Sequence, residues 1–99
     1  LLPALDARMA GLDALVLPTL PLLAPLISAV QDEENFLRTN MLLLRNPSVF
    51  NFFDLPALSL PLPRKPGDQA VGLMLVGRRG ADRELLALGA AVERLLNNL

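Results

Sequence analysis

The sequence predicts an α/β fold. Three short apolar runs, each bounded on at least one side by proline or glycine, have the length and composition of strands, at residues 12–17, 57–60 and 71–76. Elsewhere apolar residues recur every three or four positions, which is the spacing of one face of a helix. The two patterns alternate along the chain without a convincing internal repeat, as expected when helices pack on a sheet.

The N-terminal pattern predicts a helix followed by a strand. Pro3 suits a first helical turn and Gly11 a helix end, so the helix is predicted over residues 3–10. The run at 12–17 shows no polar alternation after Asp13, which predicts a strand buried on both faces. Residues 18–25 contain three prolines and are predicted to form an extended loop.

The stretch 14–30 carries no charge, so a membrane-spanning helix is an alternative there. Its length of about 17 residues lies at the lower limit for crossing the hydrocarbon core. Its three prolines would each remove a helical hydrogen bond. A buried strand leading into an apolar loop is therefore favoured, and no membrane span is expected.

Acidic residues predict the start of a central helix. Residues 32–35 are polar and suit a first helical turn, where negative charge complements the helix dipole. Helical spacing follows over 36–45, with one shared apolar face formed by Phe36, Leu37, Met41 and Leu44. Pro47 predicts that this helix ends or kinks, with a second short helical turn over 49–53.

The C-terminal part predicts two strands and an amphipathic helix. A surface loop at 63–68 separates the strand at 57–60 from the strand at 71–76, which Gly77 closes. Asp82 is predicted to be the N-cap of the last helix. The apolar face of that helix is predicted to consist of Leu85, Leu88, Gly89, Val92, Leu95 and Leu96.

The composition holds more apolar residues than a short domain can cover. Apolar residues make up 53% of the 99, mean hydropathy is +0.44, and aromatic residues make up only 4%. Further polypeptide, self-association or a membrane has to cover the surplus, since a short chain leaves about a third of its surface wet. The chain also starts inside an apolar pattern, at Leu1, with no initiator Met and no basic leader. We therefore expect residues 1–99 to be a segment of a larger domain rather than a complete one.

Charge and missing residue types exclude several functions. The net charge is −1 with both signs scattered along the chain, which disfavours nucleic-acid binding. The chain has no Cys, so disulfides and thiol nucleophiles are excluded. It has no His, which excludes Ser-His-Asp and Cys-His catalysis and the usual zinc sites. We expect neither a metal nor a cofactor.

Three blocks of the chain, in this order, resemble the C-terminal portion of the amidase-signature family. Residues 13–21, followed by Ala24-Pro25, are similar to its strand and "PTxP" segment. Residues 51–61 are similar to its "N-x-x-G-x-P-A-x-S-x-P" stretch, which is the most specific of the three. Residues 71–77 with the helix after them are similar to its closing strand and helix, so the resemblance covers residues 12–96.

The same blocks depart from the family at three positions. Asp54 stands where the family usually has Gly, so the backbone there is less permissive. Ala70 replaces a frequent Pro, and Met74 sits where many members carry Gln. These departures leave the subfamily and the amide substrate open.

The resemblance implies both a fold and a mechanism. The fold is an α/β/α sandwich around a mixed sheet, with about three strands and three to four helices in this segment. The implied nucleophile is a Ser activated by a second Ser on a cis peptide and by a Lys, with backbone N–H groups stabilising the oxyanion. That triad lies upstream in the family, whereas this chain has only Ser28, Ser48, Ser59 and Lys65. No catalytic residue is therefore predicted here, and the segment alone is expected to be inactive.

Two constellations within the chain have simpler roles than catalysis or binding. Ser59 and Lys65 are six residues apart, across a strand and a proline-rich loop, with nothing to supply an oxyanion hole. Residues 77–80 precede a helix and could cradle an anion, but Asp82 at the helix start would repel it. A strand serine, a solvated lysine and a connecting loop are the favoured interpretations.

Thr19 and Asn51 are the candidate substrate-pocket residues. Thr19 lies just past a strand end, and Asn51 matches the family's Asn after a helix that carries substrate-binding residues in some relatives. The alternatives are favoured, namely that Thr19 satisfies loop backbone and Asn51 caps a turn. Arg38 and Arg45 lie on or near the same helix and could pair with a substrate carboxylate, although no motif promotes either.

These observations predict the segment of a cytoplasmic amidase-type hydrolase of C–N bonds. Its expected partners are the rest of the amidase chain and a small-molecule amide, and the isolated segment is expected to self-associate through its apolar faces. The alternative is a small non-catalytic α/β interaction module that forms an obligate homo-oligomer. A Gly/Ser-rich stretch with a Lys upstream in the same reading frame would decide for the amidase.

Overall fold

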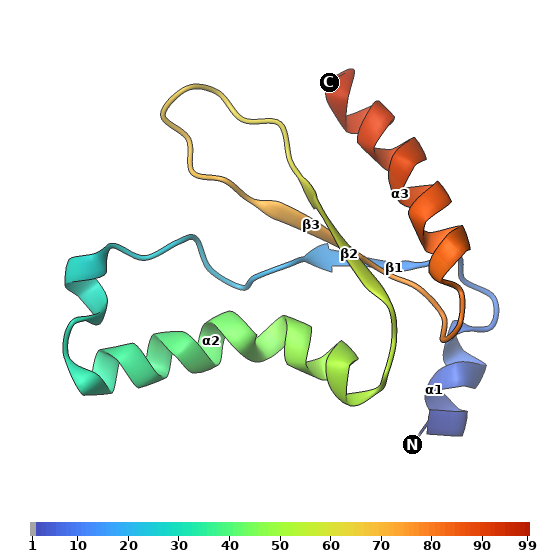
Figure 1. Cartoon of the computed structure of the whole chain (residues 1–99), viewed down its shortest axis with the longest axis horizontal. Helices are drawn as coiled ribbons and strands as arrows, with labels where there is room; N and C mark the ends of the chain where they lie inside the picture. The colour runs from blue at the N-terminus through green and yellow to red at the C-terminus, as the bar shows by residue number, and fades with distance from the viewer. Residues whose placement is uncertain (1) are drawn as a thin grey trace.

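The structure, a computed structural model, describes residues 2–99, with side chains from Pro3 onward. Three α-helices, one 3-10 helix and three strands follow one another in these residues. Figure 1 shows the three strands together at the centre of the view, with the helices around them. The elements are α1 (Leu2–Met9), β1 (Leu15–Pro18), η1 (Ile27–Val30), α2 (Glu33–Phe52), β2 (Ala57–Pro61), β3 (Gly72–Val76) and α3 (Asp82–Asn97).

The three strands form one sheet in the order β1-β3-β2. The middle strand, β3, is antiparallel to both neighbours, and its Met74 is paired with Leu17 of β1 and Ser59 of β2. The predicted α/β class and the predicted number of strands are confirmed. The mixed sheet expected for the whole fold is not represented within residues 2–99, whose strand pairings are both antiparallel.

Helices cover both faces of the sheet, because alternate residues of β3 point into different cores. On one face α1, the C-terminal end of α2 and β3 meet in a cluster of Met9, Leu55, Met74 and Val76. On the other face α3 packs on β2 and β3 through Leu60, Leu75 and Leu85. Leu75 is only 1% exposed, and burying a side chain of this size contributes about 1.5–3 kcal/mol. The α/β/α layering is present in this segment.

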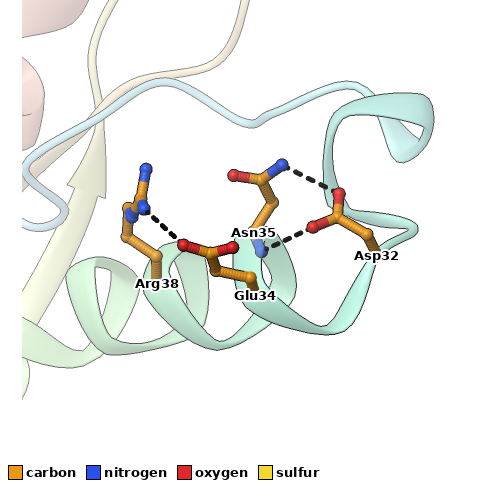
Figure 2. A network of polar contacts seen from close by, with 4 residues as sticks. All are labelled: Asp32, Glu34, Asn35 and Arg38. Atoms are coloured by element: carbon orange, nitrogen blue, oxygen red, sulfur yellow. Dashed lines mark hydrogen bonds and ion pairs between the residues drawn. The ribbon is translucent and has the colours of Figure 1, made fainter.

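The N-terminus of α2 is fixed by a side-chain cap (Figure 2). Asp32 Oδ2 accepts a hydrogen bond from the Asn35 backbone N–H at 3.1 Å, and Oδ1 accepts one from the Asn35 side-chain amide at 2.8 Å. These two bonds hold the pKa of the Asp32 carboxyl below its ordinary value, and the bond from the backbone N–H has the larger effect. The acidic first turn predicted from the sequence is confirmed, with Glu34 also paired to Arg38 at 3.3 Å.

Pro47 does not end the central helix, so of the two predicted outcomes, an end or a kink, the end is wrong, and the turn predicted at 49–53 belongs to the same helix. One helix, α2, runs from Glu33 to Phe52 with Pro47 inside it. Proline lacks the N–H that would bond to Leu43, a defect that typically costs about 3 kcal/mol in a helix interior. The helix continues because Phe50 and Phe53, beyond the proline, pack against the core cluster of α1 and β3. Tertiary packing therefore outweighs the local preference.

The first strand is shorter and more exposed than predicted. β1 covers four residues, Leu15–Pro18, in place of the six predicted at 12–17. Leu15 and Leu17 pack against the core cluster, but Val16 is 61% exposed on the opposite face. The prediction of a strand buried on both faces is wrong for this segment, because β1 lies at one edge of the three-stranded sheet and α3 packs on β2 and β3 instead.

The last helix follows its predicted pattern with two corrections. Asp82 is the first residue of α3, and Ala81, which makes no side-chain cap, occupies the N-cap position. Leu95 is 66% exposed, so it does not belong to the packed face. The other five predicted residues of that face are buried or half-buried, with Leu85 at its centre. The loop predicted at 63–68 is exposed throughout and closes through Asp68, whose carboxylate accepts the Lys65 backbone N–H.

The segment is open and flat for its length. The radius of gyration is 15.7 Å, against about 13 Å for a compact domain of 100 residues. Large apolar side chains of α2 and of the stretch around η1 are exposed, among them Met41 at 73% and Ile27 at 81%. Within residues 2–99, no helix combines the length and the apolar character that a bilayer crossing requires.

Candidate functional site

The candidate site is a hollow of about 440 Å³ at the end of β1, between the loop that follows this strand, the middle of α2 and the start of β3. This volume lies within the range of small-molecule pockets. The lining is mostly aliphatic and contains, among the described residues, one charged side chain, that of Arg45. The lining residues are Pro18, Leu20, Pro21, Leu22, Leu23, Ala24, Arg45, Asn46, Ala70, Val71 and Gly72.

A pair of hydroxyl groups supports the floor of the hollow. Thr19 Oγ1 and Ser59 Oγ are hydrogen bonded at 2.6 Å, and they join the end of β1 to β2 across β3. The Thr19 backbone N–H also donates to the Gly72 carbonyl at 3.0 Å. A Cβ on Gly72 would lie 2.6 Å from Ser59 Oγ and 2.8 Å from Thr19 Oγ1. The hydroxyl pair therefore occupies the space that a side chain at position 72 would fill.

The loop after β1 is anchored to α2 by an amide. Asn46 Nδ2 donates a hydrogen bond to the Pro18 carbonyl at 3.0 Å, and Asn46 itself is half-buried. Its Oδ1 accepts a longer bond, 3.4 Å, from Nε of Arg45. In this way Asn46 fixes the loop on one side and directs the neighbouring guanidinium on the other. The terminal nitrogens of Arg45 make no hydrogen bond or ion pair to other residues of 2–99.

The two predicted pocket residues are not brought together. Thr19 is not among the lining residues but contacts one of them, because its N–H bonds to Gly72 while its hydroxyl bonds to Ser59. Asn51 is exposed in the last turn of α2, where its carbonyl accepts the Asp54 N–H. It lies five positions after Asn46, about 140° around a helix, so it lies on another side of α2. A pocket role for Thr19 and Asn51 stays a prediction.

The other two constellations have the structural roles favoured from the sequence. Ser59 lies in β2 with its hydroxyl bonded to Thr19, while Lys65 lies in the exposed loop. In the loop at 77–80, Arg79 pairs with Asp6 at 2.8 Å and donates to the Phe53 carbonyl at 2.8 Å. That arginine joins α1 to the end of α2. Among the described residues, no group of acidic side chains is arranged to hold a metal ion.

Three residues of the site were missed in the sequence. Gly72 carried a signal, because an isolated glycine inside a strand indicates a close approach of neighbouring atoms. Ser59 was recognised as a strand serine, but its bond to Thr19 spans 40 positions and no local pattern predicts it. Asn46 carried no signal in the sequence, because its bond to Pro18 spans 28 positions, which no local pattern reveals.

A family model described as Amidase matches residues 2–86 of this chain. The chain belongs to the amidase family. This amidase segment is 38% identical to an indoleacetamide hydrolase from Agrobacterium vitis over 93 residues, covering 91% of the segment and 20% of the relative. It is 35% identical to a fatty acid amide hydrolase from Medicago truncatula, covering 84% of the segment and 14% of the relative.

Solved amidase structures share the fold. The amidase segment is similar to a glutamyl-tRNA(Gln) amidotransferase chain from Thermotoga maritima, with a TM-score of 0.67 and 27% identity over 85% of the segment and 18% of that chain. The crystal structure of another amidase has a TM-score of 0.66 and 33% identity, covering 96% of the segment and 23% of that chain. The segment thus spans about a fifth of the length of the relatives that it matches.

Proposed function

We propose that the complete protein carrying this segment hydrolyses carbon–nitrogen bonds of small amides. The observation that carries this proposal is the family match over residues 2–86, supported by relatives whose names describe the hydrolysis of amides. A free-standing interaction module is disfavoured by the same match. The predicted cytoplasmic location rests on the sequence alone.

The proposed chemistry uses a serine nucleophile, a second serine on a cis peptide and a lysine, all outside this segment. The serine attacks the amide carbon, the lysine and second serine relay its proton to the leaving nitrogen, and water then hydrolyses the ester. Nothing in the segment competes for these roles. Ser59 is bonded to Thr19, and Lys65 is held at the surface loop, so neither has the partner that an activated nucleophile requires.

The proposed role of the segment is structural support and one wall of the substrate pocket. β1, β2 and β3 extend the sheet, and the loop after β1 contributes the wall through the hollow that contains Gly72. Thr19 supports the floor of this wall, through its bonds to Ser59 and Gly72. Asn51 is exposed, so it can line the same pocket only where another part of the complete protein packs over the last turn of α2.

Ammonia release from a panel of primary amides tests the proposal on the complete protein. We expect turnover that depends on one lysine and two serines upstream of Leu1. Replacing any one of the three by Ala should abolish activity. Ser59→Ala is the matched serine control and should retain turnover within about threefold, a loss of less than one kcal/mol. No hydrolysis of any amide, or loss of turnover in a correctly folded Ser59→Ala variant, would contradict the proposal.

A further inference from the structure

The single charge of the hollow indicates what kind of molecule it binds. Arg45 is the one charged residue among the described residues that line it, and the rest of the lining is aliphatic except for Asn46. Four other hollows differ, because each of them is lined by charged residues of both signs, such as Arg64 with Asp68 or Arg79 with Asp6. The hollow at β1 therefore carries an uncompensated positive charge in an apolar setting.

The geometry leaves the end of the Arg45 side chain available for a ligand. Nε is bonded to Asn46 Oδ1 at 3.4 Å, and the opposite end of that amide is fixed to the Pro18 carbonyl at 3.0 Å. Among residues 2–99, no carboxylate lies within ion-pair distance of Arg45, whereas Arg38 and Arg79 are both paired. The two terminal nitrogens form a planar fork that matches the two oxygens of a carboxylate.

We propose that this hollow binds a carboxylate group of the amide substrate, with Arg45 as its partner and the aliphatic lining around the rest of the molecule. The inference rests on the proposed function and names its substrate class: small amides that carry an acid group away from the bond to be cut. Arg45 is a binding residue here and takes no part in bond breaking. Gly72 and the Thr19–Ser59 pair fix the floor beneath it.

Two matched amides test the proposal with the complete protein. Succinamate and butanamide have the same chain length and the same amide, and differ in a terminal carboxylate. We expect the wild type to have a higher kcat/KM for succinamate than for butanamide. Arg45→Gln should lower kcat/KM for succinamate about tenfold to a hundredfold, through a higher KM, and should change kcat/KM for butanamide by less than about threefold. Arg45→Lys should retain part of the preference, since it keeps the charge without the fork. Arg38→Gln, on the same face of α2 two turns away, is the control and should leave both substrates unchanged.

A binding measurement separates this inference from the proposed function. Succinate should raise the melting temperature of the wild type and of Arg38→Gln, but not that of Arg45→Gln. Equal effects of Arg45→Gln on both amides, or equal succinate binding by wild type and variant, would overturn the carboxylate site and indicate that Arg45 pairs with another part of the protein. Loss of succinate binding in Arg45→Gln without hydrolysis of any amide would refute the proposed function and support the carboxylate site.

Discussion

At the scale of single residues, Asp54 stands in a backbone conformation that favours glycine. Its φ is 58°, the one positive φ of a non-glycine residue among those described. This is the position where the amidase-signature pattern usually has Gly, so the departure noted in the sequence has a physical cost. Aspartate tolerates the left-handed region better than most residues but still incurs part of the steric penalty.

Replacing Asp54 should therefore change stability in a direction that depends on the side chain. Asp54→Gly is expected to raise the free energy of unfolding of the complete protein by about 0.5–1 kcal/mol, and Asp54→Val to lower it by more than about 1 kcal/mol. Asp54→Asn is the control and should change little, because Asn also tolerates this region. Chemical denaturation measures all three. A stabilising effect of Asp54→Val would contradict the explanation.

Gly72 is predicted to be sensitive for a different reason. A Cβ at this position would lie within 2.8 Å of both Thr19 Oγ1 and Ser59 Oγ, so Gly72→Ala should destabilise the protein by about 1–3 kcal/mol through overpacking. Ser59→Ala removes one of the two clashing oxygens. The double variant should therefore lose less than the sum of the single changes, as a double-mutant cycle by thermal or chemical denaturation would measure. Additive losses would show that the hydroxyl pair is not the cause.

At the scale of elements, the cap of α2 predicts a local dependence on pH. The carboxyl of Asp32 has a folded-state pKa below its ordinary value of 3.8, chiefly because of the Asn35 backbone N–H. A lowered pKa means that the ionised cap stabilises the helix fully above about pH 3.8 and loses this contribution as the pH falls through the lowered pKa. Asp32→Asn keeps a good cap and should remove that dependence.

An NMR titration of the Asp32 side-chain carbon in the complete protein measures this effect directly. The midpoint should lie below 3.8 in the wild type. Asn35→Ala should raise it only part of the way, because the backbone N–H, which is the larger cause, remains while the side-chain donor is lost. A wild-type midpoint at or above the ordinary value would mean that Figure 2 does not represent the cap in solution.

The elements also show what a local pattern can and cannot predict. The strands β2 and β3 and the helix α3 were predicted almost to the residue, because proline, glycine and a regular apolar spacing bound them. The continuity of α2 through Pro47 was not predicted. It depends on Phe50 and Phe53, which pack against α1 and β3, elements that are distant in sequence. The edge position of β1 was missed for the same reason, because the order of strands is set by pairing partners and not by the strand itself.

At the scale of the whole molecule, the exposed face of α2 is expected to cause self-association in the isolated segment and to be buried in the complete protein. Met41 is 73% exposed, with Leu37 and Leu44 beside it on the same face. The isolated segment should therefore self-associate, and Met41→Glu should weaken this association in sedimentation velocity. In the complete protein the same change should lower stability by about 1–3 kcal/mol, because it would place a charge where apolar chain is expected to pack.

Asn40→Glu provides the matched control for this pair of measurements. Asn40 is exposed, adjacent to Met41 and already polar, so the substitution should change neither the association nor the stability appreciably. Stabilisation or no effect of Met41→Glu in the complete protein would indicate that this face is also exposed there. A monomeric isolated segment would contradict the predicted self-association.

The candidate site belongs to this largest scale, which explains why the sequence predicted so little of it. Thr19 was found because it follows a strand end, but its partners Ser59 and Gly72 reach it only through the order of the sheet. Arg45 could not be separated from Arg38 by pattern, since both are charged residues on one helix. The two arginines differ in their partners. Arg38 forms an ion pair with Glu34 at 3.3 Å, whereas Arg45 forms none with the described residues.

The place of β3 in the sheet also governs how this part of the protein is made. β3 is the middle strand, yet it is the last of the three to leave the ribosome, so among the described strands β1 and β2 have nothing to pair with until residues 72–76 are synthesised. A nascent chain that stalls before Gly72 presents two unpaired strands and their leucines to solvent or to chaperones. We therefore expect aggregation and folding to compete until that short stretch has been synthesised.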